Sequence, residues 1–474
     1  MCGIAGFCAP RTSGRDASLQ RSINAMHHRG PDDSGIFRSV AASLGAVRLK
    51  VIDLTGGHQP MQSEDGNTVV VVNGEIFNHQ ELRAELEALG HQFKTTCDTE
   101  VVLHGFLQWD TNCFRKLRGM FAIGLWQQRE ERLLLVRDQA GIKPLYYYLA
   151  GKDLFFGSEL KVLFAHDEIP RQIDLDALNC YLCLNYVPGP QTLVKGIRKL
   201  MPGNWLEWSR GSVSIEDYKG ALPDVNPKIT LGEATSELDR LLQLSVREQM
   251  VADVPWGIWA SGGLDSSTLV HYAAAKSSKR LRTFSVTFKG RTFDESPHIR
   301  AISEHYGTDH SEFDLSSATN VTDAIEQMSY YSDEPSADAG ALPVWFLSQM
   351  SRQHVTVALG GEGADELFGG YLTYQADRYA QLARLAPRFV RTLGLSSAQL
   401  LGTSDDKISL EYKVKRFFQG SLLSREAAHV FWNGTFSEEE KRGFFRHADQ
   451  APMEKLFGTM ESGGGIEPFL RFDQ

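Results

Sequence analysis

The hydrophobic pattern of this 474-residue chain changes character about halfway along. Up to about residue 160, short β-type runs such as TVVVVNGEIF and RLLLVRD are separated by Gly, Asp and Asn, with one helix-like stretch, QELRAELEALG, that ends at Gly90. From about residue 230, strand-like and helix-like runs alternate, which is typical of a parallel α/β sheet. This change, in a chain too long for one comfortable core, predicts two domains.

The boundary is expected near residue 220, where GALPDVNPK collects Pro, Gly, Asn and Asp. We therefore expect a first domain over residues 1–215, a linker over 216–235 and a second domain over 236–474. The sequence TLGE, immediately before a run of leucines at helical spacing, has the form of a capping box and predicts the helix that opens the second domain.

Later segments of the second half continue this alternation. PWGIWA, RTFSVTF and VTVALGG are strand-like, SSTLVHYAAA is helix-like, and a further helical run finishes at Gly307. From about residue 372 to the end the sequence is rich in Leu, Ala, Arg and Glu and predicts helices, with a loose ESGGGIEP near the terminus.

Charge and cysteine usage exclude several classes of protein. The net charge of −10 offers no basic footprint for a nucleic acid. Six scattered cysteines do not form a disulfide framework, and Cys180 and Cys183, a lone CxxC, are expected to be two buried thiols one helical turn apart. No basic and apolar leader opens the chain and no window approaches a membrane span, so a cytoplasmic location without membrane contact is expected.

Cys2 directly follows the initiator methionine in MCGIAGFCAP. If Met1 is removed, one residue carries both a thiol of pKa about 8.5 and an α-amine of pKa about 7.7 to 8.0, a nucleophile with its own base. A structural cysteine at a loosely ordered chain end is the alternative that position alone leaves open.

Several further segments follow in order: HRGPDDSG (28–35), RLKVIDL (48–54), NGEIFNH (73–79), CDTE (97–100), RGMFAIGLW (118–126) and RDQAGIKPLYY (137–147). With MCGI they resemble the class II glutamine amidotransferases, whose fold is the αββα sandwich of the N-terminal-nucleophile hydrolases. The resemblance implies that Cys2 attacks the glutamine side-chain amide.

The same resemblance implies roles for other residues around glutamine. Arg48 is expected to bind the α-carboxylate and Asp98 the α-ammonium. Asn73 and Gly74 would form the oxyanion hole, and Glu75 would add substrate contacts.

A glycine turn is expected between a strand and a helix in WASGGLDSSTLV (259–270). In such a turn the backbone N–H groups point toward one place, where an anion would bind. No GK[ST] follows it, and GGEGADELFGG lacks the third glycine of a dinucleotide fingerprint. A P-loop nucleotidase and a Rossmann oxidoreductase are therefore disfavoured.

SGGLDS, TFSVTFKGRTFDES (283–296) and LGGEGADELFGGY (359–371) resemble the ATP-pyrophosphatase domain of asparagine synthetases. The resemblance implies ATP as a substrate and Mg²⁺ on its pyrophosphate. It assigns these roles: pyrophosphate contacts to Ser261, Gly262, Gly263, Ser266, Gly360 and Gly361; an adenine contact to Val286; Mg²⁺ to Asp265 and Asp365; and the acceptor or the metal to Glu362. Helix-capping carboxylates are the alternative for the acids.

Three positions depart from that family's usual pattern. Trp259 and Ala260 stand where leucines usually precede the serine, and Gly360 stands where serine is usual, which predicts an altered nucleotide pocket. Members also usually continue beyond a segment like FLRFDQ, so the second domain is expected to be short at its C-terminus.

Taken together, the two halves resemble glutamine-hydrolysing asparagine synthetase, which implies glutamine, aspartate and ATP as substrates, ammonia passed between the domains, and a possible homodimer. Two alternatives remain open. One is amidation of another carboxylate, such as a sugar acid or a secondary metabolite, decided near Asp294, Glu295 and DEPSADAGALP (333–343). The other is a glutaminase with a non-catalytic, nucleotide-binding second half.

Overall fold

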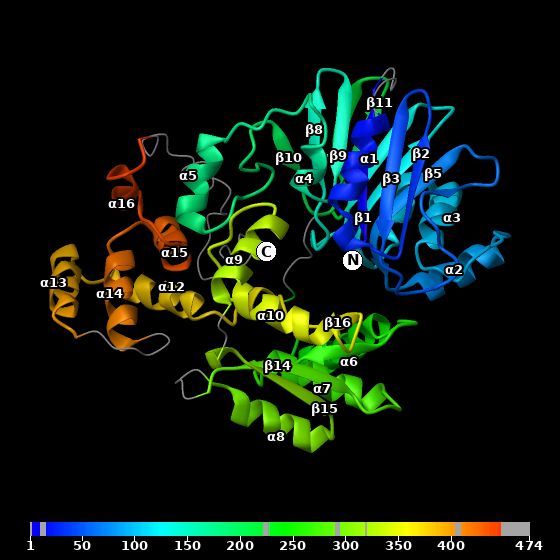
Figure 1. Cartoon of the computed structure of the whole chain (residues 1–474). Coiled ribbons are helices and arrows are strands. Elements are labelled where there is room, and N and C mark those ends of the chain that lie inside the picture. Colours follow the sequence, from blue (N-terminus) through cyan, green and yellow to red (C-terminus); the bar gives the residue numbers. More distant parts are fainter. Residues whose placement is uncertain are drawn as a thin grey trace. The chain divides into compact units, whose positions relative to one another are not determined.

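The computed structural model describes residues 2–9, 16–220, 226, 228–289, 294–317, 320–402 and 409–446. The chain forms two compact units (Figure 1). Unit 1 comprises residues 1–173, 189–256 and 355–357, and unit 2 comprises residues 174–188, 257–354 and 358–474. The part of the expected C-terminal helical region beyond residue 446, including ESGGGIEP, lies outside the described residues.

Unit 1 contains two six-stranded antiparallel sheets. The first has the order β10-β8-β9-β1-β3-β2, and the second has the order β12-β11-β7-β6-β5-β4. The strands are β1 (Gly3–Cys8), β2 (Asp33–Arg38), β3 (Ala42–Arg48), β4 (Met61–Gln62), β5 (Thr68–Ile76), β6 (Gly119–Gln127), β7 (Arg132–Arg137), β8 (Tyr146–Ala150), β9 (Asp153–Gly157), β10 (Ile197–Lys199), β11 (Asn204–Ser209) and β12 (Ser212–Asp217).

The helices of this unit cover the outer faces of the sheets or, in the case of α6, follow the last strand. They are α1 (Asp16–Ala25), η1 (His27–Arg29), α2 (His79–Ala88), α3 (Glu100–Trp109), η2 (Asp110–Arg115), α4 (Leu160–Leu163) and α6 (Leu231–Gln249). Figure 1 shows the strands of this unit, blue through cyan to green, with α1, α2 and α3 around them.

Three hydrophobic clusters define four layers. Residues of both sheets, including Trp126 and Trp208, fill the space between the sheets. A second cluster joins one sheet to α2 and α3, and a third joins the other sheet to α1 and α4. The four valines in TVVVV are consecutive because both faces of β5 are buried. Val69 and Val71 face the inner cluster, while Val70 and Val72 face α2 and α3. The αββα sandwich expected from the resemblance is confirmed.

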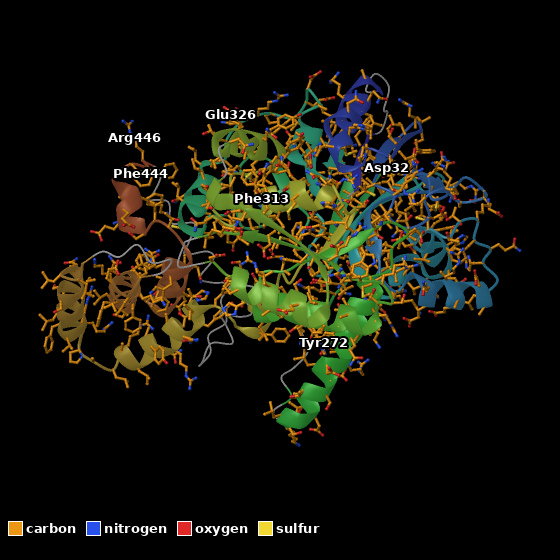
Figure 2. The ribbon with its side chains drawn as sticks, turned by 60° about the horizontal axis from the view of Figure 1, so that its bottom comes forward. Asp32, Tyr272, Phe313, Glu326, Phe444 and Arg446 are labelled. Atoms are coloured by element: carbon orange, nitrogen blue, oxygen red, sulfur yellow. The ribbon has the colours of Figure 1, made fainter. Side chains whose placement is uncertain are left out.

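Unit 2 is built on a four-stranded sheet of order β15-β14-β13-β16, in which β14 pairs in parallel with both β13 and β15. The parallel α/β expectation is confirmed. The strands are β13 (Trp256–Trp259), β14 (Arg282–Thr287), β15 (Asp309–Asp314) and β16 (Val357–Leu359). Phe313 of β15, labelled in Figure 2, stacks on Phe346 with ring centroids 5.6 Å apart.

The remaining helices also belong to unit 2, and the one early in the sequence packs with the late ones. They are α5 (Leu175–Leu184), α7 (Leu264–Lys276), α8 (Ser296–Tyr306), η3 (Leu315–Ser317), α9 (Val321–Tyr331), α10 (Ala341–Arg352), α11 (Ala364–Phe368), α12 (Leu372–Ala383), α13 (Arg388–Gln399), α14 (Leu410–Ser421), α15 (Arg425–Asn433) and α16 (Glu438–Arg442).

Local signals in the sequence correspond to the observed boundaries. Thr230 and Glu233 form the reciprocal capping box at the start of α6, and Gly307 ends α8 in the left-handed conformation. Cys180 and Cys183 are buried on α5 and pack against Val430 of α15, which confirms the expectation of two buried thiols one helical turn apart. No helix within the described ranges is long and apolar enough to cross a membrane.

Candidate active sites

Cys2 lies immediately before β1, so the first strand of the sandwich fixes its position. Its Sγ lies 3.7 Å from the carbonyl oxygen of Leu49, the residue that follows the end of β3. Burial raises the pKa of the Cys2 thiol, and the negative charges of Glu75 and Asp98 act in the same direction. Met1 lies outside the described residues, so its removal stays a prediction.

Arg29 holds the backbone at Cys2 from the other side. Its Nε donates to the carbonyl oxygen of Cys2 at 2.9 Å, and its Nη1 donates to Oε1 of Glu159 at 2.9 Å. His28 and Lys161 also contact Glu159, at 3.1 and 3.0 Å. Burial alone raises the pKa of Glu159, but the hydrogen bonds from His28 and Arg29 outweigh it and bring that pKa to about 2. Glu159 is therefore a fixed anion that orients Arg29.

Asn73 is fully buried on β5, next to the start of β1. Its Nδ2 donates to the hydroxyl of Ser158 at 3.4 Å, and that hydroxyl accepts the N–H of Ile4 at 2.9 Å. Its Oδ1 has no hydrogen-bond partner, and neither has Nη2 of Arg29. Turning the amide by 180° lets Ser158 donate to Oδ1 and leaves Nδ2 as the free donor. These orphaned buried groups indicate a place for a polar ligand beside Cys2.

Gly74 follows Asn73 on β5 at a point of close strand approach. A Cβ there would lie 2.1 Å from the carbonyl oxygen of Met120 on β6. Packing between the strands therefore requires glycine at this position, independently of any role of its N–H in catalysis.

Arg48 is buried at the end of β3 and contacts the loop that follows. Its Nη2 donates to the carbonyl oxygens of Ile52 and Asp53 at 2.9 and 3.0 Å, and its Nη1 donates to that of Gly56. Asp53, in the left-handed region with φ of 58°, accepts the N–H groups of Thr55, Gly56 and Thr96. Backbone hydrogen bonds, chiefly that of Gly56, lower the pKa of Asp53. The guanidinium thus shapes this loop, as well as being a candidate carboxylate binder.

Glu75, half-buried on β5, and the buried Asp98 form an acidic pair. Burial and the neighbouring charge of Asp98 raise the pKa of Glu75, and burial raises the pKa of Asp98. Asp98 Oδ2 also accepts the N–H of Ile76 at 2.8 Å, which ties it to β5. Two adjacent carboxyls withdrawn from water have a strong preference for a cation, and the α-ammonium of an amino acid has that charge.

The structure thus brings Cys2, Arg48, Asn73, Gly74, Glu75 and Asp98 into one network of neighbouring strands and loops. The sequence analysis missed the supporting residues Arg29, Ser158 and Glu159. Arg29 lies in the segment HRGPDDSG, which carried a recognisable signal. Ser158 and Glu159 lie in GSEL, where no local pattern marks them.

The second candidate site lies at the start of α7, where Gly263 is the N-cap. The hydroxyl of Ser266 accepts the N–H of Ser261 at 3.1 Å and lies 3.1 Å from the Ser261 hydroxyl. Gly262 has φ of 81°, and a Cβ there would meet Ile299. These contacts close the turn so that its N–H groups converge at the start of a 13-residue helix.

The LGGEGADE segment lies against this turn. A Cβ at Gly361 would be 3.1 Å from Cβ of Asp265 and 3.2 Å from the N–H nitrogen of Ser266. Beyond it, Glu362 is exposed, and Asp365 lies in the short helix α11 with its Oδ1 close to Gly370. The structure therefore brings the Gly361 backbone and Asp265 together.

Asp265 in the first turn of α7 and Asp365 in α11 are both half-buried. No group of three or more His, Cys, Asp or Glu side chains able to hold a metal occurs among the described residues. A pair of hard oxygen donors fits Mg²⁺ when phosphate oxygens complete its shell, which is the usual arrangement for this ion. Val286 is half-buried on β14, adjacent to β13.

The departure at residue 259 has a structural counterpart, because Trp259 donates from Nε1 to the hydroxyl of Ser351 at 3.2 Å. The backbone N–H of Ala260 donates to the carbonyl of Phe284 at 2.9 Å, a bond open to other residues, so nothing here explains the alanine. At Gly360 an added Cβ meets only ordinary contacts, 3.7 Å from Glu362 and 3.9 Å from Trp259. Glycine is therefore not required at that position.

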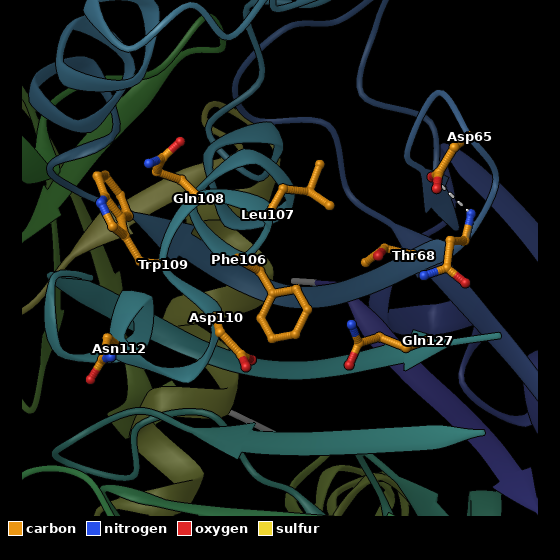
Figure 3. A pocket seen from close by; sticks show the side chains of 10 residues that line it. Asp65, Thr68, Phe106, Leu107, Gln108, Trp109, Asp110, Asn112 and Gln127 are labelled. Carbon is orange, nitrogen blue, oxygen red and sulfur yellow. Dashed lines mark hydrogen bonds between the residues drawn. The ribbon is translucent and has the colours of Figure 1, made fainter. Parts of the chain in front are cut away.

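One cavity of unit 1 lies apart from these sites. It has a volume of about 550 Å³ and lies beside α3, with Phe106, Trp109, Asp110 and Gln127 among its lining residues (Figure 3). The dashed line in the figure is the hydrogen bond from the N–H of Asn67 to Asp65, at 3.1 Å. None of the residues predicted to bind glutamine lines this cavity.

Two protein families match successive parts of the chain. A glutamine amidotransferase domain family matches residues 1–219, and an asparagine synthase family matches residues 237–456. A protein of Methanocaldococcus jannaschii named "Putative asparagine synthetase (glutamine-hydrolyzing) 2" is 33% identical over 450 residues, which cover 90% of this chain and 86% of that protein.

Two glutamine-hydrolyzing asparagine synthetases of Bacillus subtilis, numbered 1 and 3, are 36% and 34% identical. The matches cover 79% and 78% of this chain but only 60% and 63% of the relatives' own lengths. A glutamine phosphoribosylpyrophosphate amidotransferase structure from B. subtilis has a TM-score of 0.37 at 15% identity, with 73% of this chain and 92% of that one covered.

Proposed function

The chain belongs to the family of glutamine-hydrolysing asparagine synthetases, and from this membership we propose that it converts aspartate to asparagine with ammonia taken from glutamine. ATP is cleaved to AMP and pyrophosphate in the same cycle. The observation that carries the proposal is the set of groups around Cys2: a nucleophile, two orphaned polar atoms on Asn73 and Arg29, and the acidic pair Glu75 and Asp98.

Glutamine hydrolysis follows from the chemistry of these groups. Once Met1 is removed, the α-amine of Cys2 takes the thiol proton, and the sulfur attacks the side-chain amide carbon of glutamine. Nδ2 of Asn73 and the N–H of Gly74 donate to the resulting oxyanion. The protonated amine gives its proton to the departing nitrogen, ammonia leaves, and water then hydrolyses the thioester to glutamate.

Bound glutamine is oriented by charge. Its α-ammonium meets Asp98 and Glu75, and its α-carboxylate meets the guanidinium of Arg48. The Arg48 guanidinium has to share its donors with the carbonyls of the following loop, which makes that loop part of the binding site.

Unit 2 carries the second half of the reaction. Ser261, Gly262, Gly263 and Ser266 line the pyrophosphate pocket at the start of α7, while an aspartate oxygen attacks the α-phosphorus and pyrophosphate departs. Ammonia then attacks the acyl carbon of the adenylate and AMP leaves. Mg²⁺ held by Asp265 and Asp365 would neutralise the charge of the pyrophosphate.

The test measures glutamine hydrolysis and aspartate amidation separately. The wild-type chain and Cys2→Ala are each given aspartate, ATP and Mg²⁺, with either glutamine or ammonium, and asparagine and pyrophosphate are measured. We expect the wild type to form both products from either nitrogen source and Cys2→Ala to form them only from ammonium.

Failure with ammonium while glutamine is still hydrolysed overturns aspartate amidation by this chain. Other carboxylates, including sugar acids, are then tested as acceptors by pyrophosphate release. If nucleotide binds but no acceptor releases pyrophosphate, unit 2 is a binding module rather than a catalytic one.

A further inference from the structure

Cys97 is a buried thiol for which glutamine hydrolysis as proposed has no role, although it touches two of the expected glutamine-binding residues. It lies directly before Asp98, in the segment that leads into α3, and is only 2% exposed. Its Sγ lies 3.4 Å from Nη2 of Arg48 and 3.5 Å from Oδ1 of Asp98. One sulfur atom therefore joins the expected partner of the α-carboxylate to the expected partner of the α-ammonium.

Neighbouring groups hold the thiol in this place. The hydroxyl oxygen of Thr99 lies 3.1 Å from its sulfur. Gly57 lies against the contact with Arg48, because a Cβ at Gly57 would be 2.7 Å from both Nη2 of Arg48 and Sγ of Cys97. The guanidinium and the thiol are thus packed together beneath a residue that has φ of 69° and no side chain.

The directions of the hydrogen bonds follow from the chemistry of the partners. A guanidinium can only donate, so the sulfur accepts from Nη2 of Arg48. An ionised carboxylate can only accept, so the S–H of Cys97 donates to Oδ1 of Asp98. Oδ2 of Asp98 accepts the N–H of Ile76 at 2.8 Å. Each oxygen of Asp98 then has a donor, which favours its charged form.

The surroundings of Asp98 make this donor important. Burial raises the pKa of Asp98, whereas a charge on His79 and the hydrogen bond from Cys97 act in the opposite direction. Glu75 and Cys2 are the other titratable groups that interact with Asp98. Burial also raises the pKa of Cys97 to about 12, so its proton stays in place at neutral pH. Cys97 is therefore a neutral donor to a carboxylate that burial works against.

We propose that the Cys97 thiol is a positioning residue for glutamine, which accepts a hydrogen bond from Arg48 and donates one to Asp98. An α-amino acid carries its ammonium and its carboxylate on one carbon, so the groups that bind them must lie close together, as two groups sharing one sulfur do. The identity of the ligand rests on the proposed function. Cys97 touches no reacting atom, keeps its proton and forms no covalent bond.

The test is the pH dependence of glutamine binding by the full chain. Calorimetric titration is made on the Cys2→Ala chain, so that glutamine is not consumed, and on the same chain with Cys97→Ala added. We expect the pH at which half of the affinity is lost to move up by about half a unit to one unit, with a roughly three- to tenfold loss of affinity below it. The loss should shrink at higher pH, where Asp98 is charged in both proteins. A merely structural defect would weaken binding equally at every pH.

Two further variants, each added to the Cys2→Ala chain, serve as controls. Cys97→Ser keeps a group that both accepts and donates, and it should retain most of the pH profile. Cys113→Ala removes another buried thiol of unit 1, on η2 in the cluster beside α3, and should leave the profile unchanged. If Cys97→Ala does not fold, Cys97→Val takes its place as a side chain without a donor, with tryptophan emission as the check of folding.

A raised midpoint in Cys97→Ala with a nearly normal one in Cys97→Ser supports the proposal. An unchanged midpoint in a folded variant without the donor, or an equal loss of affinity at every pH, overturns it. If the Cys2→Ala chain binds glutamine but the wild type forms no asparagine, the proposed amidation fails while the role of Cys97 stands. If the Cys2→Ala chain binds no glutamine at any pH, the proposed function and the role of Cys97 fail together.

Discussion

The guanidinium of Arg29 donates from Nε to the carbonyl oxygen of Cys2 at 2.9 Å. This bond fixes the backbone of a residue that lies outside any strand, at the end of the chain where backbone is usually least ordered. Arg29 is in turn fixed by Glu159, so the position of the nucleophile depends on a carboxylate more than 150 residues away in sequence.

Glu159→Gln is expected to lower glutamine hydrolysis by about tenfold, because Arg29 loses its anionic partner and the nucleophile loses its fixed position. Glutamate release measures the effect. Synthesis from ammonium should stay at the wild-type rate, because unit 2 is not altered. A wild-type rate of glutamine hydrolysis in the folded variant would show that Arg29 does not need Glu159.

The same carboxylate should affect stability in acid. Its folded pKa of about 2 lies below the ordinary value of 4.5, so its contribution is complete above pH 4.5 and is lost as pH falls toward 2. The wild type should therefore lose more stability than Glu159→Gln between pH 5 and about 3 in urea unfolding followed by tryptophan emission. Parallel losses in the two proteins would contradict this.

Glutamine binding should weaken as the pH is lowered. The weakening should begin at a pH well above the range in which ordinary carboxyl groups titrate. The pKa values of Glu75 and Asp98 are raised, so these groups lose their charge at a higher pH than an ordinary acid and no longer attract the α-ammonium. The KM for glutamine is expected to rise about tenfold per pH unit below the effective pKa of the pair, while kcat changes less. In Glu75→Gln this rise should move to lower pH, because Asp98 no longer faces a second carboxylate. If KM depends on pH in the same way in Glu75→Gln and in the wild type, the acidic pair is not the cause of the rise in KM.

Gly361→Val and Gly360→Ser form a matched pair for the nucleotide site. A Cβ at Gly361 lies 3.1 Å from Asp265 and 3.2 Å from Ser266, so valine must push the two segments apart, whereas serine at Gly360 meets only ordinary contacts. We expect ATP affinity to fall at least tenfold in Gly361→Val and to stay within about threefold in Gly360→Ser, by calorimetric titration. Equal affinities in the two variants would show that the contact is not needed for ATP.

Gly74→Ala and Gly105→Ala should change stability in opposite directions. The new methyl at residue 74 would lie 2.1 Å from the carbonyl of Met120, so the strands must separate at a cost of about 2 to 3 kcal/mol. At residue 105, inside α3, the methyl has contacts of 3.6 Å, and a gain of about 0.5 to 1 kcal/mol is expected from helix propensity. Urea unfolding followed by tryptophan emission measures both. Equal destabilisation of the two variants would show that the close approach of β5 and β6 at Gly74 does not require glycine.

Much of the fold could be predicted because its signals are local. The capping box at Thr230, the left-handed Gly307 and the strand TVVVV each depend on residues within a few positions of one another, and each is found as expected. The grouping of α5 with the late helices could not be predicted, because its buried cysteines pack against Val430, some 250 residues later. The expected limits of the two domains stay a prediction.

The sequence by itself determined the chemistry available to this protein: a cysteine at position 2, an Asn-Gly pair on a buried strand, and a glycine turn before a helix. Only the tertiary structure decided which groups support them. Glu159 follows β9, which pairs with β1, and it acts on Cys2 through Arg29; this carboxylate acquires its role from burial and neighbouring charge. Both depend on distance in space, and no local pattern in a sequence encodes that distance.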